Sequence, residues 1–419
     1  MKLALSLRPV ALAFLLLAGG AALAQPATYK IAYIDPLSGP FANVGELMLA
    51  HTRYAIDDIN ARGGLPGGQK MQLLQFDSKL SAQESQSALQ AAIDQGARAI
   101  VTGGSGSSVV AALVQAVNRW NERNPGKELL VLNHSSIDPD LTGKSCSFWH
   151  FQTDANTAMK MKAIANYIKK TPDVKKVYLL NQDYAHGKQW ASYGRQMVGL
   201  ARPDVQFVGE ALHPIGRVKD FSPYLANIKQ SGADSVITGN WGQDMTLLLK
   251  AAGDAGYNLR YFNHSAGSVP GTVLAVSQAR MGQLTWVAEW HPGQADVPKV
   301  DALAKAYKAK TQKDFLAPRI EMTPRILAAA IVKAGSTDAS KIAKAMEDLT
   351  FESVVGPVRM RAEDHQLLLP QVVNTIAPVD GKTVKVGWEG TTYGFRTDAV
   401  YTGNELAQGT ECRMVRPAQ

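Results

Sequence analysis

Short apolar runs alternate along the first part of the chain with longer segments that have the character of helices. Residues 29–34 form one such run, and prolines and glycines at 36–40 interrupt it. A helix is predicted at 45–61, stopped by the glycine pair at 63–64. The same series continues with predicted strands at 71–76, 98–101 and 129–132 and predicted helices at 81–96 and 108–122. Ser81 and Glu84 have the spacing of a capping box at a helix start.

The alternation restarts after Asn156. Strands are predicted at 177–180, 205–208, 235–238 and 259–262, and helices at 158–170, 188–200, 221–230 and 245–252. Short apolar strands separated by helices are typical of parallel sheets covered by helices on both faces. The two series therefore predict an α/β protein with two similar, doubly wound, parallel-sheet lobes.

The remainder of the chain is expected to complete these lobes. It contains predicted strands at 284–287, 358–361 and 384–388 and predicted helices at 300–310, 324–333 and 339–348. We expect about three hinge crossovers between the lobes, near 151–156, 283–288 and 354–362. The predicted division is an N-terminal lobe of 27–151 plus 287–355 and a C-terminal lobe with tail of 152–286 plus 356–419.

The first 24 residues have the pattern of a secretory signal peptide. Lys2 and Arg8 precede a short apolar run at 10–18, and the segment ends in Ala-Leu-Ala at 22–24. We expect cleavage after Ala24, which leaves no cysteine at the new N-terminus for a lipid anchor. The sequence therefore predicts an exported protein of the periplasm, not lipid-anchored.

Composition narrows the class of protein. The 419 residues are 46% hydrophobic and 19% charged, as in an ordinary globular protein, which excludes a disordered chain, a coiled coil or a fibre. The 44 Lys and Arg exceed the 36 Asp and Glu and give a net charge of +8. Because no basic run accompanies this excess, no nucleic-acid partner is expected.

The chain has two cysteines, Cys146 and Cys412. An oxidising compartment permits a disulfide between them. We predict this bond, which would tie the C-terminal tail to the body of the protein, and two free thiols are the alternative.

The loops that follow the strands are the expected binding site, because open parallel sheets bind ligands beyond the carboxyl ends of their strands. These loops lie at 36–44, 103–108, 133–137, 181–187, 239–244 and 263–267. Two lobes that face each other across them would form a cleft able to close on a solute by hinge bending.

Several motifs occur in a distinctive order along the chain. They begin with Pro-Leu-Ser-Gly-Pro at 36–40 and Ala-x-x-Asp-Ile-Asn-Ala-Arg-Gly-Gly at 55–64, and continue through 183–187, 219–222 and 355–358. In order and spacing they resemble the substrate-binding proteins of branched-chain amino acid ABC transporters, over about residues 28–365. The resemblance implies a type I periplasmic binding protein fold, like that of Leu/Ile/Val-binding proteins. It also implies capture of a small solute and its delivery to a membrane permease.

The loop at 103–108 opens a helix, so its free N–H groups and the helix dipole favour an anion. In the relatives this loop grips the ligand carboxylate, and small hydroxyl residues after the fourth strand assist it. The alternatives are an ordinary helix cap and a serine-rich turn. The predicted ligand contacts of this lobe are Ser38, Phe41, Ser105, Gly106, Ser107, His134, Ser135 and Ser136.

The second lobe is expected to supply the other wall. Relatives place an aromatic residue against the ligand at the position of Trp241, for which core packing is the alternative reading. Tyr184 lies in the motif at 183–187, and His186 stands where relatives carry a ligand-facing Tyr. Phe41 would form the opposing wall in the first lobe.

The segment Asn263-His264-Ser265 departs from the family pattern. Amino-acid binders carry an acidic residue near here to pair with the ligand ammonium, and His264 or Ser265 aligns with it. A buried ammonium without a counter-charge is costly. Either Asp183 or Asp244 substitutes for that residue, or the ligand is an aromatic or aliphatic acid without an α-amino group.

His134, His186 and His264 all fall on these loops, but no His-x-x-x-His pair accompanies them, so we expect no metal and no cofactor. The loop at 103–108 matches neither a nucleophile elbow nor a dinucleotide fingerprint, which argues against an enzyme.

The predicted function is the extracytoplasmic solute-binding component of an ABC importer. Its expected partners are a small carboxylate ligand and the membrane permease subunits, with no nucleic acid, and the protein is expected to be a monomer. A ligand-sensing module that reports to a membrane receptor is the alternative, and an exported enzyme is the weaker one.

Overall fold

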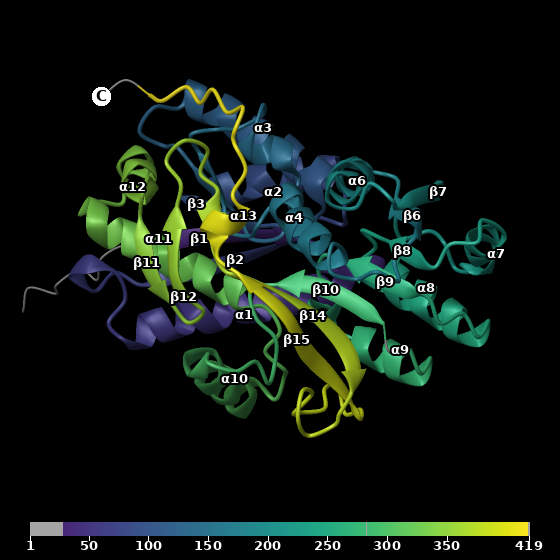
Figure 1. Ribbon diagram of the computed structural model, residues 1–419. Coiled ribbons are helices and arrows are strands. Elements are labelled where there is room, and N and C mark those ends of the chain that lie inside the picture. Colours follow the sequence, from purple (N-terminus) through teal and green to yellow (C-terminus); the bar gives the residue numbers. More distant parts are fainter. Residues whose placement is uncertain (1–27, 282, 418–419) are drawn as a thin grey trace, which may run out of the picture.

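The computed structural model describes residues 28–281 and 283–417 and has two lobes, each built on its own sheet (Figure 1). The predicted signal peptide lies outside the described residues. The first sheet has five parallel strands in the order β2-β1-β3-β4-β5. Its strands are β1 (Tyr29–Asp35), β2 (Met71–Asp77), β3 (Ala99–Thr102), β4 (Leu130–Asn133) and β5 (His150–Gln152). Its connecting helices are α1 (Ala42–Ala61), α2 (Ala82–Asp94) and α3 (Ser107–Arg123).

Strand alternation buries both faces of this sheet. On β1, Ile31 and Tyr33 enter one apolar cluster, whereas Ala32 and Ile34 enter another beneath α2 and α3. Half of the predicted capping box forms: the Ser81 hydroxyl accepts a hydrogen bond from the Glu84 N–H at 3.4 Å, and α2 begins one residue later, whereas the Glu84 carboxylate accepts from Lys79 Nζ. Four of the five strands of the first lobe and its three connecting helices follow from the pattern of the sequence, whereas β5 was not predicted because its three residues overlap the segment expected to be a hinge.

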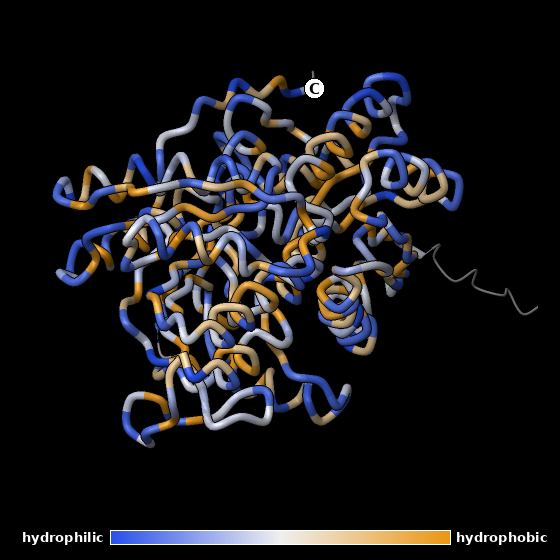
Figure 2. The backbone as a smooth tube through the Cα atoms, turned by 90° about the vertical axis from the view of Figure 1, so that its right-hand side faces the viewer, coloured by the Kyte–Doolittle hydropathy of each residue, from blue (hydrophilic) through white to orange (hydrophobic). Residues whose placement is uncertain are grey.

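The second sheet has seven strands in the order β15-β14-β10-β9-β8-β6-β7. Its parallel part consists of β6 (Lys176–Gln182), β7 (Gln206–His213), β8 (Ser235–Ile237), β9 (Arg260–Asn263) and β10 (Leu284–Ala288). The helices around it are α4 (Thr157–Ile168), α5 (Ala185–Tyr193), α6 (Gly199–Ala201), α7 (Ser222–Gln230), α8 (Gln243–Asp254) and α9 (Thr272–Gln278). Figure 2 shows apolar stretches through the centre of the molecule and hydrophilic turns at many of its outer edges.

Two antiparallel strands extend the second sheet beyond the prediction. β14 (Gln371–Pro378) pairs with β10, and β15 (Tyr393–Tyr401) pairs with β14. The strand predicted at 384–388 was wrong. That segment belongs to the loop between β14 and β15, where the Asp380 carboxylate accepts hydrogen bonds from the N–H groups of Lys382, Thr383 and Val384 and holds the backbone in a turn.

The remaining elements pack beside the first lobe. They are α10 (Pro298–Thr311), α11 (Pro318–Ala334), α12 (Ala339–Met346) and a small antiparallel sheet of β11 (Thr350–Ser353), β12 (Gly356–Met360) and β13 (Leu367–Leu368). α11 packs against α1 and α12. β12 contains most of the strand predicted at 358–361.

The chain passes between the lobes after β5, after β10 and between β13 and β14. The first passage lies where the sequence predicted it. The third comes later than the predicted 354–362, because that segment pairs within its own small sheet before the chain reaches β14.

The C-terminal tail returns to the first lobe through α13 (Gly403–Leu406), along the upper edge in Figure 1. Cys412 forms a disulfide with Cys146, with 5.6 Å between their Cα atoms, which confirms the predicted bond. The Thr410 hydroxyl also donates to the carbonyl of Thr142 at 3.0 Å. The tail therefore belongs with the first lobe in space, although it follows strands of the second.

Candidate ligand-binding site

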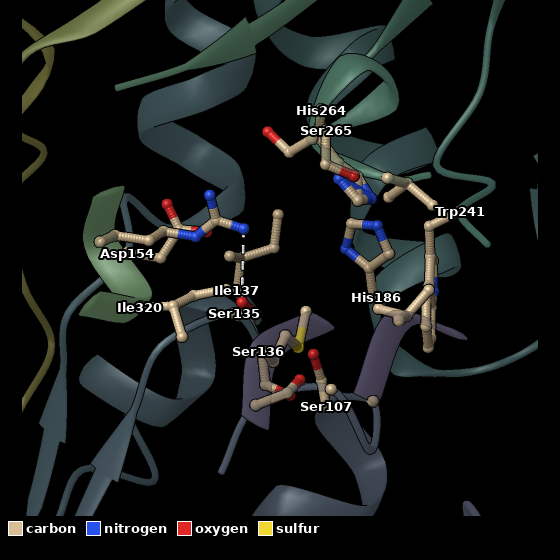
Figure 3. Close-up of a pocket in the computed structure, with 18 of the residues that line it drawn as sticks. Ser107, Ser135, Ser136, Ile137, Asp154, His186, Trp241, His264, Ser265 and Ile320 are labelled. Carbon is tan, nitrogen blue, oxygen red and sulfur yellow. Dashed lines mark hydrogen bonds and ion pairs between the residues drawn. The ribbon is translucent and has the colours of Figure 1, made fainter. Parts of the chain in front are cut away.

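A cavity lies between the lobes, where the carboxyl ends of their central strands face each other (Figure 3). The first lobe supplies part of α1, the loops after β3 and β4, and the start of α11. The second lobe supplies the loops after β6, β8 and β9. The lining residues are Val44, Met48, Gly103, Gly104, Gly106, Ser107, Ser135, Ser136, Ile137, Asp154, Tyr184, His186, Trp241, His264, Ser265, Ser268, Val269, Arg319 and Ile320.

The loops after β3 and β4 meet closely on the first-lobe side of this cavity. A Cβ at Gly103 would lie 2.6 Å from the backbone nitrogen of Ser135, so only glycine allows this approach. Ser107 begins α3, and its hydroxyl makes no hydrogen bond with any described residue. It points into the cavity in Figure 3. A free hydroxyl at a helix N-terminus is suited to an anionic group.

Asn133, at the end of β4, organises the neighbouring turn. Its Oδ1 accepts hydrogen bonds from the N–H groups of Ser135 at 3.3 Å and Ser136 at 2.9 Å. The Ser136 hydroxyl donates to the Gly103 carbonyl at 2.7 Å. The fold therefore already uses the N–H groups of both serines, and only their side chains and the surrounding loop remain to contact a ligand.

Arg319 brings a buried guanidinium to the same end of the cavity. It lies in the first turn of α11, and its Nη2 donates to the Ser135 hydroxyl at 3.3 Å, the dashed contact in Figure 3. Its Nη1 contacts both carboxylate oxygens of Glu289, at 3.1 and 3.2 Å, and its Nε lies 3.1 Å from Asp154. Burial alone would lower the pKa of Arg319, but Asp154 and Glu289 hold the pKa above its ordinary value. The guanidinium is therefore fixed and charged.

Lys160 completes a buried cluster of four charged groups. Its Nζ lies 3.0 Å from Oδ1 of Asp154, whose other oxygen faces Arg319. Burial would raise the pKa of Glu289, and the charges of Arg319 and Lys160 outweigh that effect and lower the pKa. Two cations thus neutralise two carboxylates, and neither carboxylate is left without a cationic partner.

The second-lobe side of the cavity is aromatic and uncharged. Trp241 donates through Nε1 to the Tyr184 hydroxyl at 2.8 Å. The rings of His186 and His264 meet edge to face at 4.4 Å between centroids. Burial lowers the pKa of His186 to about 3, with the Gly239 backbone opposing it only in part. Burial, and then the neighbouring His186, holds the pKa of His264 well below its usual range.

Nine of the predicted ligand contacts line the cavity: Gly106, Ser107, Ser135, Ser136, Tyr184, His186, Trp241, His264 and Ser265. The other four do not line it. The Ser38 hydroxyl donates to Asp77 at 2.6 Å, and Ser105 is held inside the first lobe by Asp35 and Ser78.

Phe41 and His134 also lie outside the lining. Phe41 packs against Trp241, with 4.3 Å between ring centroids. His134 Nε2 lies 3.4 Å from Asp35, and its carbonyl accepts from Arg319 Nε at 3.0 Å. Both residues support groups that line the cavity.

Sequence reasoning missed Arg319 and Asp154. The available signal was an arginine inside the otherwise apolar segment at 315–320, since a charge there needs a buried partner. Neither acidic residue offered as a counter-charge lines the cavity. Asp183 is half exposed and pairs with Lys188, whereas Asp244 accepts from Gln182 and from the Gly216 N–H.

Within residues 28–281 and 283–417, no group of three or more His, Cys, Asp or Glu is placed to hold a metal ion. No helix in the same part of the chain is long and apolar enough to cross a bilayer.

Two α/β lobes joined by three chain passages, with a polar-ended cavity closed between them, define a two-lobed solute-binding protein. Comparison with known proteins agrees with this class. The chain belongs to the periplasmic binding protein family, whose model matches residues 28–377.

The chain is 32% identical to Leu/Ile/Val-binding protein homolog 4 of Brucella abortus over 422 residues, with 97% of each chain covered. A solved structure of the leucine-, isoleucine-, valine-, threonine- and alanine-binding protein of Brucella ovis, in a closed conformation, superposes with a TM-score of 0.81. It is 31% identical, with 93% of this chain and all of that one covered. A solute-binding protein of Rhodopseudomonas palustris in complex with 3,4-dihydroxybenzoic acid has a TM-score of 0.75 at 17% identity, covering 90% and 98%, and shares the fold.

Proposed function

We propose that this protein is the periplasmic solute-binding component of an ABC importer and that it binds a small carboxylate without an α-ammonium group. The observation that carries the ligand class is the charge at the cavity. A fixed guanidinium and a free hydroxyl face it at the first-lobe end, and both nearby carboxylates are already paired with cations. A ligand carboxylate would accept hydrogen bonds from Ser107, Ser135 and Arg319.

An α-ammonium group has no suitable partner there. His264 and Ser265, the two positions where a counter-charge was expected, are uncharged, and Asp183 and Asp244 are paired away from the cavity. Besides burial, the charge of Lys160 lowers the pKa of both His186 and His264, and the charge of Arg319 also lowers the pKa of His264, so a further positive charge on this wall is opposed. Placing a further cation among these groups would cost several kcal/mol, on the order of the penalty for a buried unpaired ion.

The fold itself does not decide the ligand. Its relatives include a Brucella ovis protein named for five amino acids and a Rhodopseudomonas palustris protein bound to a dihydroxybenzoic acid. The side chains at the cavity therefore carry the assignment.

The lobes touch around the cavity, as closure on a ligand requires. Phe41 of the first lobe contacts Trp241 of the second, and the Ser108 hydroxyl accepts from the Ala185 N–H at 3.4 Å. A ligand that contacts both lobes would favour this closed state over an open one by its differential contacts. The closed surface would then dock on the permease.

The direct test is a thermal-shift screen of protein refolded from denaturant, which removes any ligand retained from the cell. The panel contains amino acids, their amides, and aliphatic and aromatic carboxylates. A carboxylate present at 100 times its dissociation constant would stabilise the protein by about 2.7 kcal/mol. Stabilisation by branched-chain amino acids and by no organic acid would overturn the ligand assignment.

Binding of the same carboxylate by Ser107→Ala tests the site itself. Ser87→Ala, on the exposed surface of α2, is the matched control. Loss of one hydrogen bond to a charged group should weaken binding about tenfold or more. Equal affinities of the two variants for the carboxylate would show that Ser107 does not contact the ligand.

Export belongs to the same proposal. Sequencing the N-terminus of protein taken from the periplasm should start at Gln25, immediately after the predicted cleavage point. Protein found only inside the cytoplasm with its first residues intact would contradict it.

We also propose that the protein works as a monomer. Light scattering of the purified protein measures its molar mass and tests this.

A further inference from the structure

We propose that the ligand carries a neutral hydrogen-bonding group, such as a hydroxyl or carbonyl, at the end remote from its carboxylate, and that His186 and Ser268 receive that group. The inference rests on the proposed function and specifies its substrate class. It is carried by polar atoms on the second-lobe side of the cavity that have no partner within the protein.

His186 differs from every other histidine of the chain. Only 2% of it is exposed, and neither ring nitrogen has a hydrogen-bond partner among the described residues. The other seven histidines each make at least one hydrogen bond, for example His51 to Leu47, His213 to Asn240 and His291 to Thr397. The Gly239 carbonyl accepts from His264 Nε2 at 3.3 Å, and the Gly239 backbone also lies near the His186 ring and opposes the lowering of its pKa, without making a hydrogen bond of ordinary geometry to it.

His186 lines the cavity, and Figure 3 shows its ring beside Trp241, across the cavity from Asp154 and Ser135. Ser268 lines the same cavity from the segment after β9, and its hydroxyl is also buried without a partner. Other buried hydroxyls, such as that of Ser85, also lack a partner, but His186 and Ser268 combine this property with a place in the cavity lining, where a ligand atom would complete their hydrogen bonds.

The side chains on the second-lobe side of the cavity favour an uncharged group at the far end of the ligand. A neutral imidazole offers one donor and one acceptor, and a serine hydroxyl offers both. No acidic residue lines this side to hold a cation, and Trp241, Tyr184 and Val269 leave it largely apolar. A hydroxyl or carbonyl matches these partners, whereas a second carboxylate or an ammonium would be left without an opposite charge.

The experiment measures dissociation constants by calorimetry for ligands that share a carboxylate and differ at the far end. One series is benzoate, 4-hydroxybenzoate, terephthalate and 4-(aminomethyl)benzoate. The other is pentanoate, 5-hydroxypentanoate, glutarate and 5-aminopentanoate. In at least one series the hydroxy acid should bind about tenfold more tightly than its unsubstituted parent, and the doubly charged members should bind more weakly than the hydroxy acid.

His186→Leu should reduce the affinity for the hydroxy acid about tenfold more than the affinity for the unsubstituted parent, and so remove the preference between them. Ser268→Ala should reduce the preference in part. Ser85→Ala is the matched control, because Ser85 is an equally buried hydroxyl without a partner on α2, away from the cavity. A purely structural role for His186 would change the affinities for both ligands alike.

The outcomes separate the two proposals. If carboxylates bind but the hydroxy acid shows no advantage, or keeps it in His186→Leu, this inference is wrong and the proposed function stands. If no carboxylate in either series binds, both are wrong.

Discussion

At the scale of single residues, the two ends of the cavity differ in the hydrogen-bonding groups that they present. Arg319 and Ser107 offer donors to an anion, whereas His186 and Ser265 offer only neutral groups. Because the carboxylates of Asp154 and Glu289 already neutralise two buried cations, the described residues around the cavity leave no unpaired negative charge for an amino acid's ammonium. Ser265 is the position at which that charge is most simply restored.

Ser265→Glu should therefore shift the preference toward amino acids. A carboxylate at this position would pair with an α-ammonium, and the ratio of leucine affinity to 4-methylpentanoate affinity should rise at least about tenfold. Calorimetry of both ligands measures the ratio, and Ser87→Glu on the surface of α2 is the control. An unchanged ratio in a folded Ser265→Glu protein would mean that Ser265 does not face the ligand's α-position.

His186 also gives the stability of the protein a defined pH dependence. Its pKa is lowered by burial to about 3, whereas a histidine in the unfolded chain has a pKa near 6.5. The unfolded chain therefore binds more protons below pH 6.5. Stability is complete above that pH and is lost as the pH falls toward 3. At pH 5 this single group should cost about 2 kcal/mol relative to pH 7.

Thermal unfolding of the wild type and of His186→Leu at pH 7 and pH 5 checks this prediction. The drop in Tm between the two pH values should be smaller in the variant, because one fewer proton is bound on unfolding. An equal drop in both proteins would show that His186 is accessible to protons in the folded state.

At the scale of elements, sequence patterns predicted the parallel strands of both sheets except β5, because nearly all of these strands are short apolar runs followed by a helix. β14 and β15 were not predicted, because antiparallel strands at a sheet edge are not separated by helices and so lack this alternating pattern. Arg319 was not predicted as a site residue for a related reason. α11 follows the second passage between the lobes, and only the folded chain brings its first turn beside Ser135. Loop residues next to predicted strands were found, whereas cavity residues contributed by distant elements were not.

The contact between the short turn before α1 and the loop after β8 holds the lobes together. Phe41 fits against Trp241 and beside Gly216 and Gly242, where a Cβ would approach the Phe41 ring to 2.9 and 2.6 Å. Both glycines have positive φ, and any side chain there would push the ring out. This contact joins the first lobe to a residue that lines the cavity.

Phe41→Ala should weaken ligand binding by favouring the open state. Loss of a large apolar contact between the lobes should raise the dissociation constant about tenfold or more, with a larger radius of gyration in small-angle scattering without ligand. Phe76→Ala, on β2 of the first lobe alone, is the control and should lower Tm without this change in radius. Equal radii and affinities for Phe41→Ala and the wild type would contradict a role in closure.

At the scale of the whole molecule, the disulfide links the C-terminal tail to the first lobe. Cys146 and Cys412 are 266 residues apart, so the bond closes a very long loop of the unfolded chain. The tail has few other contacts with the first lobe, such as the hydrogen bond from Thr410 to Thr142 and that from Arg416 to Ala362.

The double variant Cys146→Ser, Cys412→Ser should therefore be less stable by about 2–5 kcal/mol, the usual effect of losing a native disulfide. Thermal unfolding of the variant, and of the wild type with and without reductant, measures the loss. A Tm unaffected by either change would show that the bond does not support the fold. Ligand affinity should change little, since both cysteines lie away from the cavity lining.

The property of the molecule that decides its ligand class is that no described residue between the lobes offers a partner for a ligand ammonium. The most direct measurement compares acids with amino acids of the same carbon skeleton, by calorimetry on ligand-free protein: 4-methylpentanoate with leucine, and 3-phenylpropanoate with phenylalanine. We predict that in the pair that binds, the acid binds at least about a hundredfold more tightly than its amino acid. Tighter binding of the amino acid in either pair would contradict the assignment and require a counter-charge at the cavity that the closed structure does not provide.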